Sequence, residues 1–421
     1  MKEIFIIEDN LSNKISYYHM LAFLVALPFE RFYSELILIS LLLHELIHLT
    51  KEKLRSFRTP IMLPALLFLL TLAGSLYTSH RGQAFAELEK ELAFVLLPFI
   101  FAVTALDIPK YHLRLLKGFV IVCTATVVYL YMDAFLVIRY NHLPLNILLS
   151  TSFMNHNFSL PIDLHATYLS MYLLLSSTIL IYLLNNPHNS TQRLLYFAGL
   201  AILLAGLIQL SSKAVLIAAI FIINIVLPFM LVKRDRRLKI ILITVLVSVV
   251  LIVGLTRIDS IQTRYISGLK EDLAKLPVNI NDVETRVARW QSAWELAKES
   301  LLFGHGSGSE IQILTQRYYQ DRLYNSYLLQ LNVHNQYLSF LLKTGLIGLF
   351  IYIYLLYAAG KRGVLAKDAV FCSFVIIVVT VSFSENLLNL NKGIFFFSFF
   401  YSFLMRKNYS ADYKKLALVQ S

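Results

Sequence analysis

Long runs of apolar residues, separated by short polar breaks, recur along the chain from about residue 17 to residue 405. The run at 240–255 is apolar on every face, which excludes the alternating pattern of a membrane β-strand and indicates a helix. Because a helix needs about 20 residues to cross a bilayer, the first, second, fourth and last runs are short, and the predicted count is ten to twelve. The predicted spans are 17–30, 34–50, 60–78, 91–106, 113–138, 165–184, 193–210, 213–232, 239–256, 336–358, 367–384 and 393–405.

Composition leads to the same class. Of the 421 residues, 57% are hydrophobic and 15% are charged, whereas soluble domains have about 45–50% and about 25%. The mean hydropathy is +0.64. A soluble enzyme is therefore excluded, and an all-α polytopic membrane protein is predicted. The formal net charge of +12 does not indicate a nucleic-acid partner, because the basic residues fall in short clusters between the spans.

Those basic residues predict the orientation. If the N-terminus is cytoplasmic, 22 Lys and Arg fall on the cytoplasmic side, which is the side where they are normally in excess. Both termini are then cytoplasmic. The short outer loops receive only six, namely Arg31, Arg81, Lys90, Arg139, Lys213 and Lys392.

One connection is much longer than the others and predicts a four-part organisation. Residues 1–256 form the first nine spans, 257–335 an outer loop domain, 336–405 the last three spans and 406–421 a cytoplasmic tail. The loop domain has nine basic and nine acidic residues, so an anion site there depends on local placement. Within it, large apolar residues at helical spacing predict an amphipathic helix over 284–303 that Gly304 ends, and a second helical stretch over 308–331.

His334 and Asn335 stand where the loop domain meets the tenth span. Imidazole exchanges protons near neutral pH, so His334 is a candidate general base at the membrane surface. The alternative is a water-facing histidine at a helix start, which a lone histidine does not exclude.

Two arginines, Arg286 and Arg289, lie one turn apart at the start of the predicted amphipathic helix. Guanidinium groups bind phosphate oxygens in a fork, and helix N-termini favour anions. A pyrophosphate site is one interpretation, and a solvated helix face with Glu284 and Glu295 as neighbours is the other.

Two lysines interrupt apolar sequence. Lys213 follows Ser211 and Ser212 between two spans, so it either reaches lipid head groups or binds an anion in an aqueous cavity. Lys343 lies nine residues beyond His334 in an otherwise apolar run, which makes it a candidate by the same reasoning.

Three further patterns carry less information. The segment F-G-H-G-S-G at 303–308 follows a helix instead of a strand, so a turn is favoured over a phosphate-binding loop. His156, Asp163 and His165 match no compact zinc spacing, and no metal site is predicted. Glu385 in S-F-S-E-N, at the outer end of a span, is a candidate to orient a base or a sugar hydroxyl, or else a helix-terminal carboxylate in water.

The order of these motifs is recognisable. T-R-x-x-x-W-x-x-A at 285–293, F-G-x-G-x-G at 303–308 and H-N-x-Y-L-x-x-L-x-x-x-G-x-x-G at 334–348 follow one another in and after the single large outer loop. This arrangement resembles the O-antigen ligase family of membrane glycosyltransferases, which also includes O-antigen polymerases and some protein O-oligosaccharyltransferases. The likeness is specific over about 284–350 and topological elsewhere.

The resemblance implies a GT-C-like fold in the bacterial inner membrane, with the active site facing the periplasm. It implies transfer of a glycan from undecaprenyl pyrophosphate to lipid A-core or another glycan acceptor, with inversion and without metal or cofactor. The family's loop arginine falls on Arg286, its loop histidine on His334 beside Asn335, and its basic residue between two spans on Lys213. A lysine there is a point charge where arginine would be a fork. Arg289 and Glu385 complete the predicted substrate contacts.

A polymerase that extends the same lipid-linked donor is the main alternative to a ligase. A single large outer loop favours the ligase, because polymerases of this kind often have two. A transporter is disfavoured because the polar candidates gather at the outer surface instead of the midplane.

Overall fold

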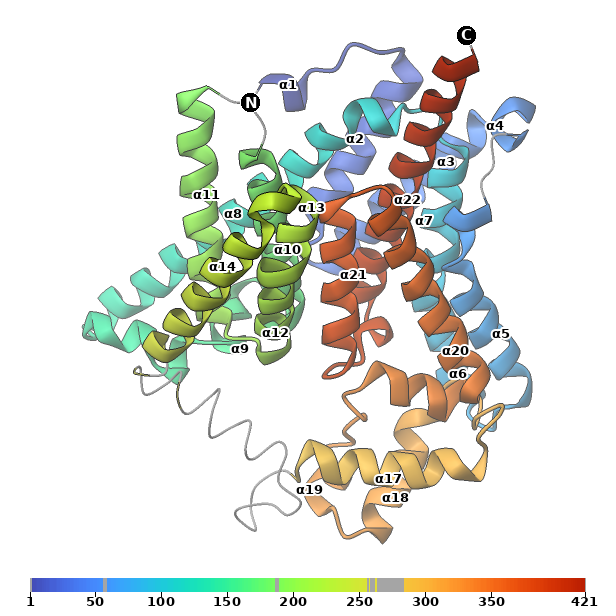
Figure 1. The fold of residues 1–421 in the computed structure, drawn as a ribbon. Helices are drawn as coiled ribbons and strands as arrows, with labels where there is room; N and C mark the ends of the chain where they lie inside the picture. Colours follow the sequence, from blue (N-terminus) through green and yellow to red (C-terminus); the bar gives the residue numbers. More distant parts are fainter. Residues whose placement is uncertain are drawn as a thin grey trace.

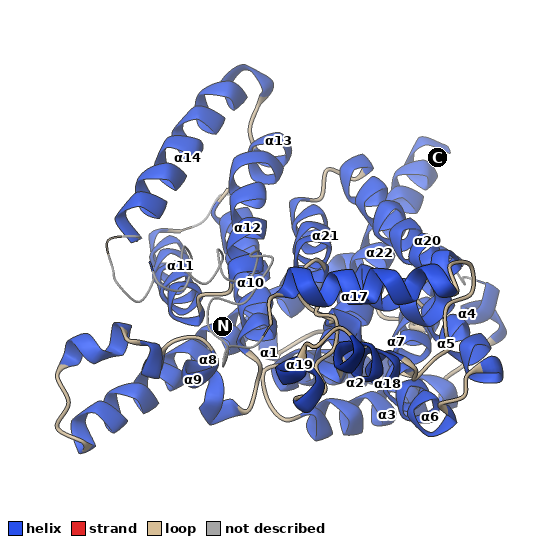
Figure 2. Ribbon diagram, turned by 90° about the horizontal axis from the view of Figure 1, so that it is seen from below, coloured by secondary structure: helices blue, strands red, loops and turns tan. Residues whose placement is uncertain are grey.

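The computed structural model describes residues 2–55, 59–185, 189–255, 257, 262 and 284–420. The chain is 81% helical, and the described part has no strand (Figure 2). The predicted all-α class is thus confirmed.

In the described part of the chain, six helices are long and apolar enough to cross a membrane, by length and composition. They are α8 (Ile108–Tyr140), α10 (Ala166–Leu184), α11 (Ser190–Leu210), the continuous helix from α12 (Lys213–Phe221) to α13 (Leu227–Leu231), α14 (Arg234–Leu255) and α20 (Gln336–Leu365). Each of the other predicted spans contains a shorter or more polar helix: α2 (Leu11–Ala26), α3 (Arg31–Ile47), α5 (Ala65–Tyr77), α7 (Ala93–Val103), α21 (Ala369–Ser382) and α22 (Asn391–Gln420). Every predicted span is therefore helical, and the number of crossings stays a prediction.

An aromatic core holds α22 among its neighbours. The ring of Phe399 packs on Phe23 of α2 at 5.3 Å and on Phe101 of α7 at 5.1 Å between centroids, and Phe400 packs on Phe119 of α8 at 5.0 Å. Rings of this size contribute large buried areas and prefer defined geometries. This packing fixes the position of the short connection before α22, which carries Glu385.

The outer loop domain contributes α17 (Arg286–Glu299), α18 (Glu310–Gln320) and α19 (Tyr324–Leu328). These helices lie at the end of the molecule opposite to both termini (Figure 1). The predicted helix over 284–303 ends earlier, at Glu299, and the predicted stretch over 308–331 is two helices, because the chain turns at Arg322 with φ of +59°. Most of the predicted domain before residue 284 lies outside the described residues.

The glycine-rich segment 303–308 is a tight packing element. Its backbone N–H groups at His305 and Gly306 donate to the carbonyls of Leu342 and Lys343 at 2.8 and 2.9 Å. The N–H of Gly308 donates to Glu87 of α6 (Arg81–Glu91) at 3.1 Å. Because protein acceptors already occupy these donors, the segment joins the loop domain to α20 and α6, in agreement with the prediction that it is not a phosphate-binding loop.

Candidate active site

Arg286 is the first residue of α17, and the helix begins there because the side chain of Thr285 caps it. The Thr285 hydroxyl accepts from the backbone N–H of Ala288 at 3.2 Å. Arg286 then reaches across to the connection between α21 and α22, where its Nη1 donates to the carbonyl of Ser384 at 3.0 Å. The loop arginine is thus tied to a segment 98 positions later in the chain.

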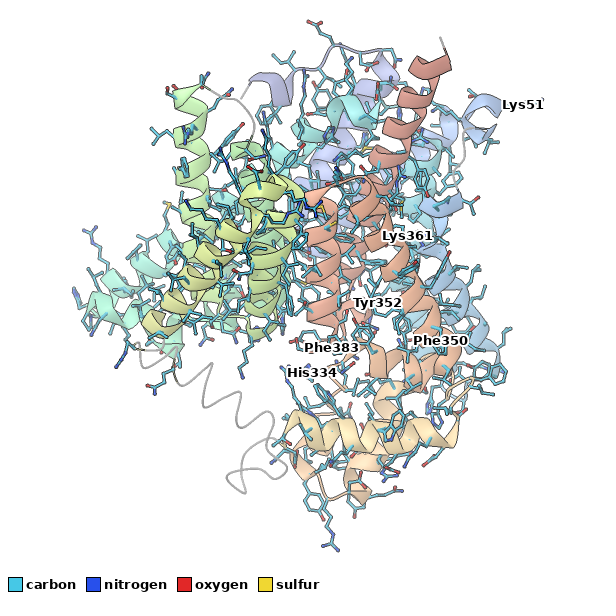
Figure 3. The ribbon with its side chains drawn as sticks, in the orientation of Figure 1. Lys51, His334, Phe350, Tyr352, Lys361 and Phe383 are labelled. Atoms are coloured by element: carbon cyan, nitrogen blue, oxygen red, sulfur yellow. The ribbon has the colours of Figure 1, made fainter. Side chains whose placement is uncertain are left out.

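His334 lies in the turn between α19 and α20, below the end of α21 (Figure 3). Two contacts hold this turn: Trp290 Nε1 donates to the carbonyl of Val333 at 3.0 Å, and the His334 N–H donates to the side chain of Asn332 at 2.9 Å. The backbone of His334 has φ of +48°, in the left-handed region that costs energy for most residues. Its side chain remains 26% exposed.

Glu385 joins the histidine to the arginine. Its Oε2 lies 3.2 Å from His334 Nδ1, and its Oε1 lies 4.0 Å from Arg286 Nη2. Burial raises the pKa of the Glu385 carboxyl, but the hydrogen bond from His334 and the positive charges around it outweigh burial, so the pKa lies below its ordinary value. We call His334, Glu385 and Arg286 the His334 cluster. All three residues are candidates predicted from the sequence, and the structure brings them together.

A second carboxylate, Glu310 at the start of α18, holds the surrounding backbone. Its Oε1 accepts from Asn386 at 2.6 Å and from the N–H of Val333 at 3.4 Å, and its Oε2 accepts from Asn389 at 3.3 Å and from Ser339. We call these five residues the Glu310 cluster. It links the residue before His334 to the residues after Glu385. No sequence pattern marked Glu310, because the residues it joins are up to 79 positions away.

The other predicted site residues are described by contacts outside the His334 cluster. Asn335 caps α20, since its Oδ1 accepts from the N–H groups of Tyr337 and Leu338 at 3.0 and 3.1 Å. Arg289 is only 6% exposed and lies near Tyr318 inside the loop domain. Lys213 begins α12, which packs against α10 and α21. Their contacts with substrate stay predictions.

Lys343 is an internal cation. It is 4% exposed, and its Nζ lies 3.4 Å from Glu87 Oε1 and 3.5 Å from Asn389 Oδ1.

The side-chain rings of His156 and His165 are 4.1 Å apart between centroids. Among the described residues, no group of three or more His, Cys, Asp or Glu is placed to hold a metal ion.

The His334 cluster has the parts of an acid–base site. A carboxylate that accepts from Nδ1 of a histidine fixes the ring and leaves Nε2 to take a proton. A permanent guanidinium charge lies beside this pair. Such an arrangement deprotonates a hydroxyl and stabilises a developing anion.

Comparison with known families supports the predicted resemblance. Residues 198–353 match the model of the family described as O-antigen ligase. The match includes Lys213, Arg286, Arg289, His334 and Asn335, and it ends before Glu385. No curated protein matches the chain. Together with the helical architecture, the match supports a membrane enzyme of the O-antigen ligase or polymerase type.

Proposed function

We propose that the protein is a glycosyltransferase that moves a glycan from undecaprenyl pyrophosphate to lipid A-core at the periplasmic face of the bacterial inner membrane. The observation that carries this proposal is the His334 cluster, with a histidine, a carboxylate and an arginine from three separate segments in contact. The family match over 198–353 supplies the class of reaction.

In the proposed reaction, an acceptor hydroxyl attacks the anomeric carbon of the lipid-linked sugar. His334 Nε2 takes the hydroxyl proton, while Glu385 stabilises the charge that forms on the ring. The bond from the anomeric carbon to the pyrophosphate oxygen breaks, and its electron pair leaves with undecaprenyl pyrophosphate. One direct displacement inverts the anomeric centre. No metal or cofactor takes part in this scheme.

Cations assist the departure of the pyrophosphate, because fixed charges stabilise the negative charge that grows in the transition state. Arg286 is the candidate in the His334 cluster, and Arg289 and Lys213 are further candidates. Both termini lie at the opposite end from α17, α18 and α19 (Figure 1), which agrees with cytoplasmic termini and a periplasmic site. The GT-C-like fold with ten to twelve crossings and the four-part division of the chain belong to the same proposal.

The main alternative is a polymerase that adds the glycan to another lipid-linked repeat, and a protein O-oligosaccharyltransferase is a further one. All three use the same donor and the same His334 cluster and differ only in the acceptor. An experiment must therefore identify which acceptor receives the glycan.

The decisive experiment supplies purified protein in detergent, in a buffer with a metal chelator, with undecaprenyl-pyrophosphate-linked glycan. Lipid A-core is added to one reaction and further donor to a parallel one. Glycan on lipid A-core establishes the ligase, and a longer lipid-linked glycan establishes the polymerase. If no glycan is transferred to lipid A-core or to further donor, the ligase and the polymerase are both refuted. A protein acceptor or a transporter is then the next hypothesis to test.

An arginine pair provides the matched control. Arg286→Gln removes the charge from the His334 cluster and should abolish most transfer, whereas Arg286→Lys keeps a point charge and should retain part of it. Arg317→Gln, near the end of α18, removes a charge paired with Asp321 at 2.9 Å and should leave transfer unchanged. Equal loss in Arg286→Gln and Arg317→Gln would refute a specific role for Arg286.

A further inference from the structure

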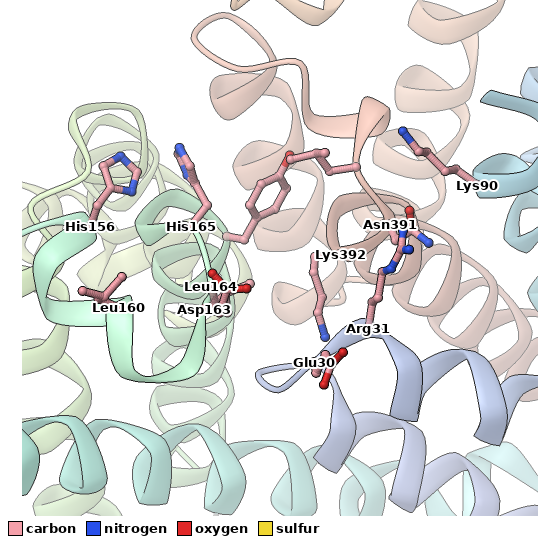
Figure 4. A pocket seen from close by; sticks show the side chains of 12 residues that line it. Glu30, Arg31, Lys90, His156, Leu160, Asp163, Leu164, His165, Asn391 and Lys392 are labelled. Carbon is pink, nitrogen blue, oxygen red and sulfur yellow. The ribbon is translucent and has the colours of Figure 1, made fainter. Parts of the chain in front are cut away.

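A pocket of about 580 Å³ lies beside the His334 cluster and is formed by four separate segments (Figure 4). The segments are the start of α3, the end of α6, the stretch from α9 (His156–Ser159) to α10, and the start of α22. In Figure 4, the two histidines lie on one side of the pocket and Arg31, Lys90 and Lys392 on the other.

The pocket shares residues with the surroundings of the His334 cluster. His165 lines the pocket and interacts electrostatically with Glu385, His334 and Arg286. Tyr168 also lines it, and its hydroxyl donates to the carbonyl of Leu387 at 3.4 Å, two residues after Glu385. A ligand in the pocket would therefore lie next to the candidate base.

The charge of the pocket is unusual for its location. Only six Lys and Arg fall in the short loops predicted to lie outside, and three of them line this one pocket. In the described part of the chain, neither Arg31 nor Lys90 makes a side-chain hydrogen bond or ion pair, and Lys392 is held by the carbonyls of Ala26 and Phe29. Glu35 and Glu30 also interact electrostatically with Lys392. Because like charges repel when they are brought together, the other two cations, Arg31 and Lys90, indicate an anionic ligand.

Carboxylates and an amide occupy the same pocket. Glu30, Asp163 and Asn391 line it together with the cations. A simple phosphate needs only the cations, whereas acidic and amide oxygens accept hydrogen bonds from hydroxyl groups. The combination fits a ligand that carries both a phosphate and sugar hydroxyls.

We propose that this pocket binds a phosphorylated sugar of a glycolipid substrate, with Arg31 and Lys90 holding the phosphate and Glu30 and Asp163 accepting from hydroxyls. The proposal rests on the proposed glycosyltransferase function and names the pocket that holds one of its substrates. The phosphate belongs either to the acceptor, lipid A-core, or to the donor, undecaprenyl pyrophosphate, and the two sources are the two arms of the test.

The test measures equilibrium binding of lipid A-core and of undecaprenyl-pyrophosphate-linked glycan, each alone and in the same detergent, to the full chain. The variant Arg31→Gln/Lys90→Gln removes the two cations. The control Arg81→Gln/Arg139→Gln removes two other outer cations, both exposed and outside the pocket lining. Both variants lower the outer charge equally, so non-specific attraction to a lipid head group changes equally in both.

We expect the pocket variant to bind one of the two probes at least tenfold more weakly than the control does, and Arg31→Gln alone to give an intermediate loss. The probe that is affected identifies whether the phosphate comes from the acceptor or the donor. Equal weakening in both double variants, or no weakening in either, overturns the proposal.

Binding does not require turnover, so the two proposals fail differently. His334→Asn should bind both probes like the wild type, even though its glycan transfer is slower by roughly 10²- to 10⁴-fold. A wild-type protein that binds a probe through Arg31 and Lys90 but transfers nothing refutes the glycosyltransferase and keeps the anion pocket.

Discussion

Two carboxylates meet at the connection between α21 and α22 and differ in what surrounds them: Glu385 belongs to this connection, and Glu310 accepts from Asn386 and Asn389 in it. Glu310 is 2% exposed and accepts from four neutral donors, while Glu385 keeps 16% of its side chain exposed and faces a histidine and an arginine. A buried carboxylate satisfied by neutral donors fixes backbone, because losing any one partner is costly. A carboxylate that holds a histidine and a guanidinium can support proton transfer. Glu310 therefore stabilises this connection, whereas Glu385 can take part in proton transfer.

The largest expected effect is on activity and comes from substitution of His334, which contacts Glu385. Because its φ is +48°, alanine would add backbone strain, whereas asparagine tolerates this conformation. His334→Asn should lower kcat by roughly 10²- to 10⁴-fold, the usual contribution of a general base, with no change in melting temperature. Transfer to lipid A-core, measured with both substrates saturating, is the assay.

His142→Asn is the matched control, since His142 is exposed and has φ of +52°. It should keep full activity. If the two variants lose activity equally, or if His334→Asn melts well below the wild type, His334 is not the base.

Glu310→Gln should have the next largest effect. We expect this effect mainly on the stability of the folded protein. The amide places donors where Asn386 and Asn389 already donate, and each hydrogen bond to a charged group contributes about 1.5–3 kcal/mol. The two tryptophans of the chain, Trp290 and Trp294, are both on α17, and Trp290 donates to Val333. In a Trp294→Phe background, fluorescence therefore reports on the turn that carries His334.

We expect Glu310→Gln to melt several degrees lower and to shift the Trp290 emission to the red. Glu299→Gln, at an exposed position on α17, should do neither. A Glu310→Gln variant with wild-type melting temperature and Trp290 emission but low activity would show that Glu310 acts in the reaction and not in stability.

This comparison also marks what the sequence can predict. Each predicted apolar run contains a helix, because long apolar stretches are recognisable from local composition alone. The motifs identified His334, Arg286 and Glu385 separately. Their assembly depends on Glu310 and on the aromatic packing of α22, and both join residues far apart in the chain, which no local pattern encodes.

The pocket beside the His334 cluster could not be predicted from the sequence either, because its lining residues are far apart in the chain. Arg31, Lys90 and Lys392 belong to separate short outer loops of the sequence, and only the fold shows that they line one pocket. The helix end at Glu299 and the turn at Arg322 differ from the predicted bounds. Arg322 has φ of +59°, a conformation that is uncommon for residues other than glycine, so its residue type does not predict the turn.

Glu385→Gln should have a smaller effect on activity than His334→Asn. The amide still accepts from Nδ1 but no longer stabilises the charged ring, so we expect kcat to fall roughly 10- to 100-fold at an unchanged KM for both substrates. Because the two residues act as a unit, the double variant should be no slower than His334→Asn. Losses that multiply would show that Glu385 acts independently of His334.

The smallest effect is the pH dependence of stability that Glu385 contributes. Its folded-state pKa lies below the ordinary value of 4.5: burial raises it, but the His334 hydrogen bond and the charges of His334, His165 and Arg286 lower it further. The folded state therefore binds this proton more weakly than the unfolded state does, so the contribution is complete above pH 4.5 and is lost as pH falls through the folded-state pKa. Melting curves of the wild type and of Glu385→Gln should converge as pH falls below 4.5, whereas Glu299→Gln should show no such convergence. A gap that persists or widens over this range would mean that neutral hydrogen bonds, and not the charge of Glu385, hold it beside His334.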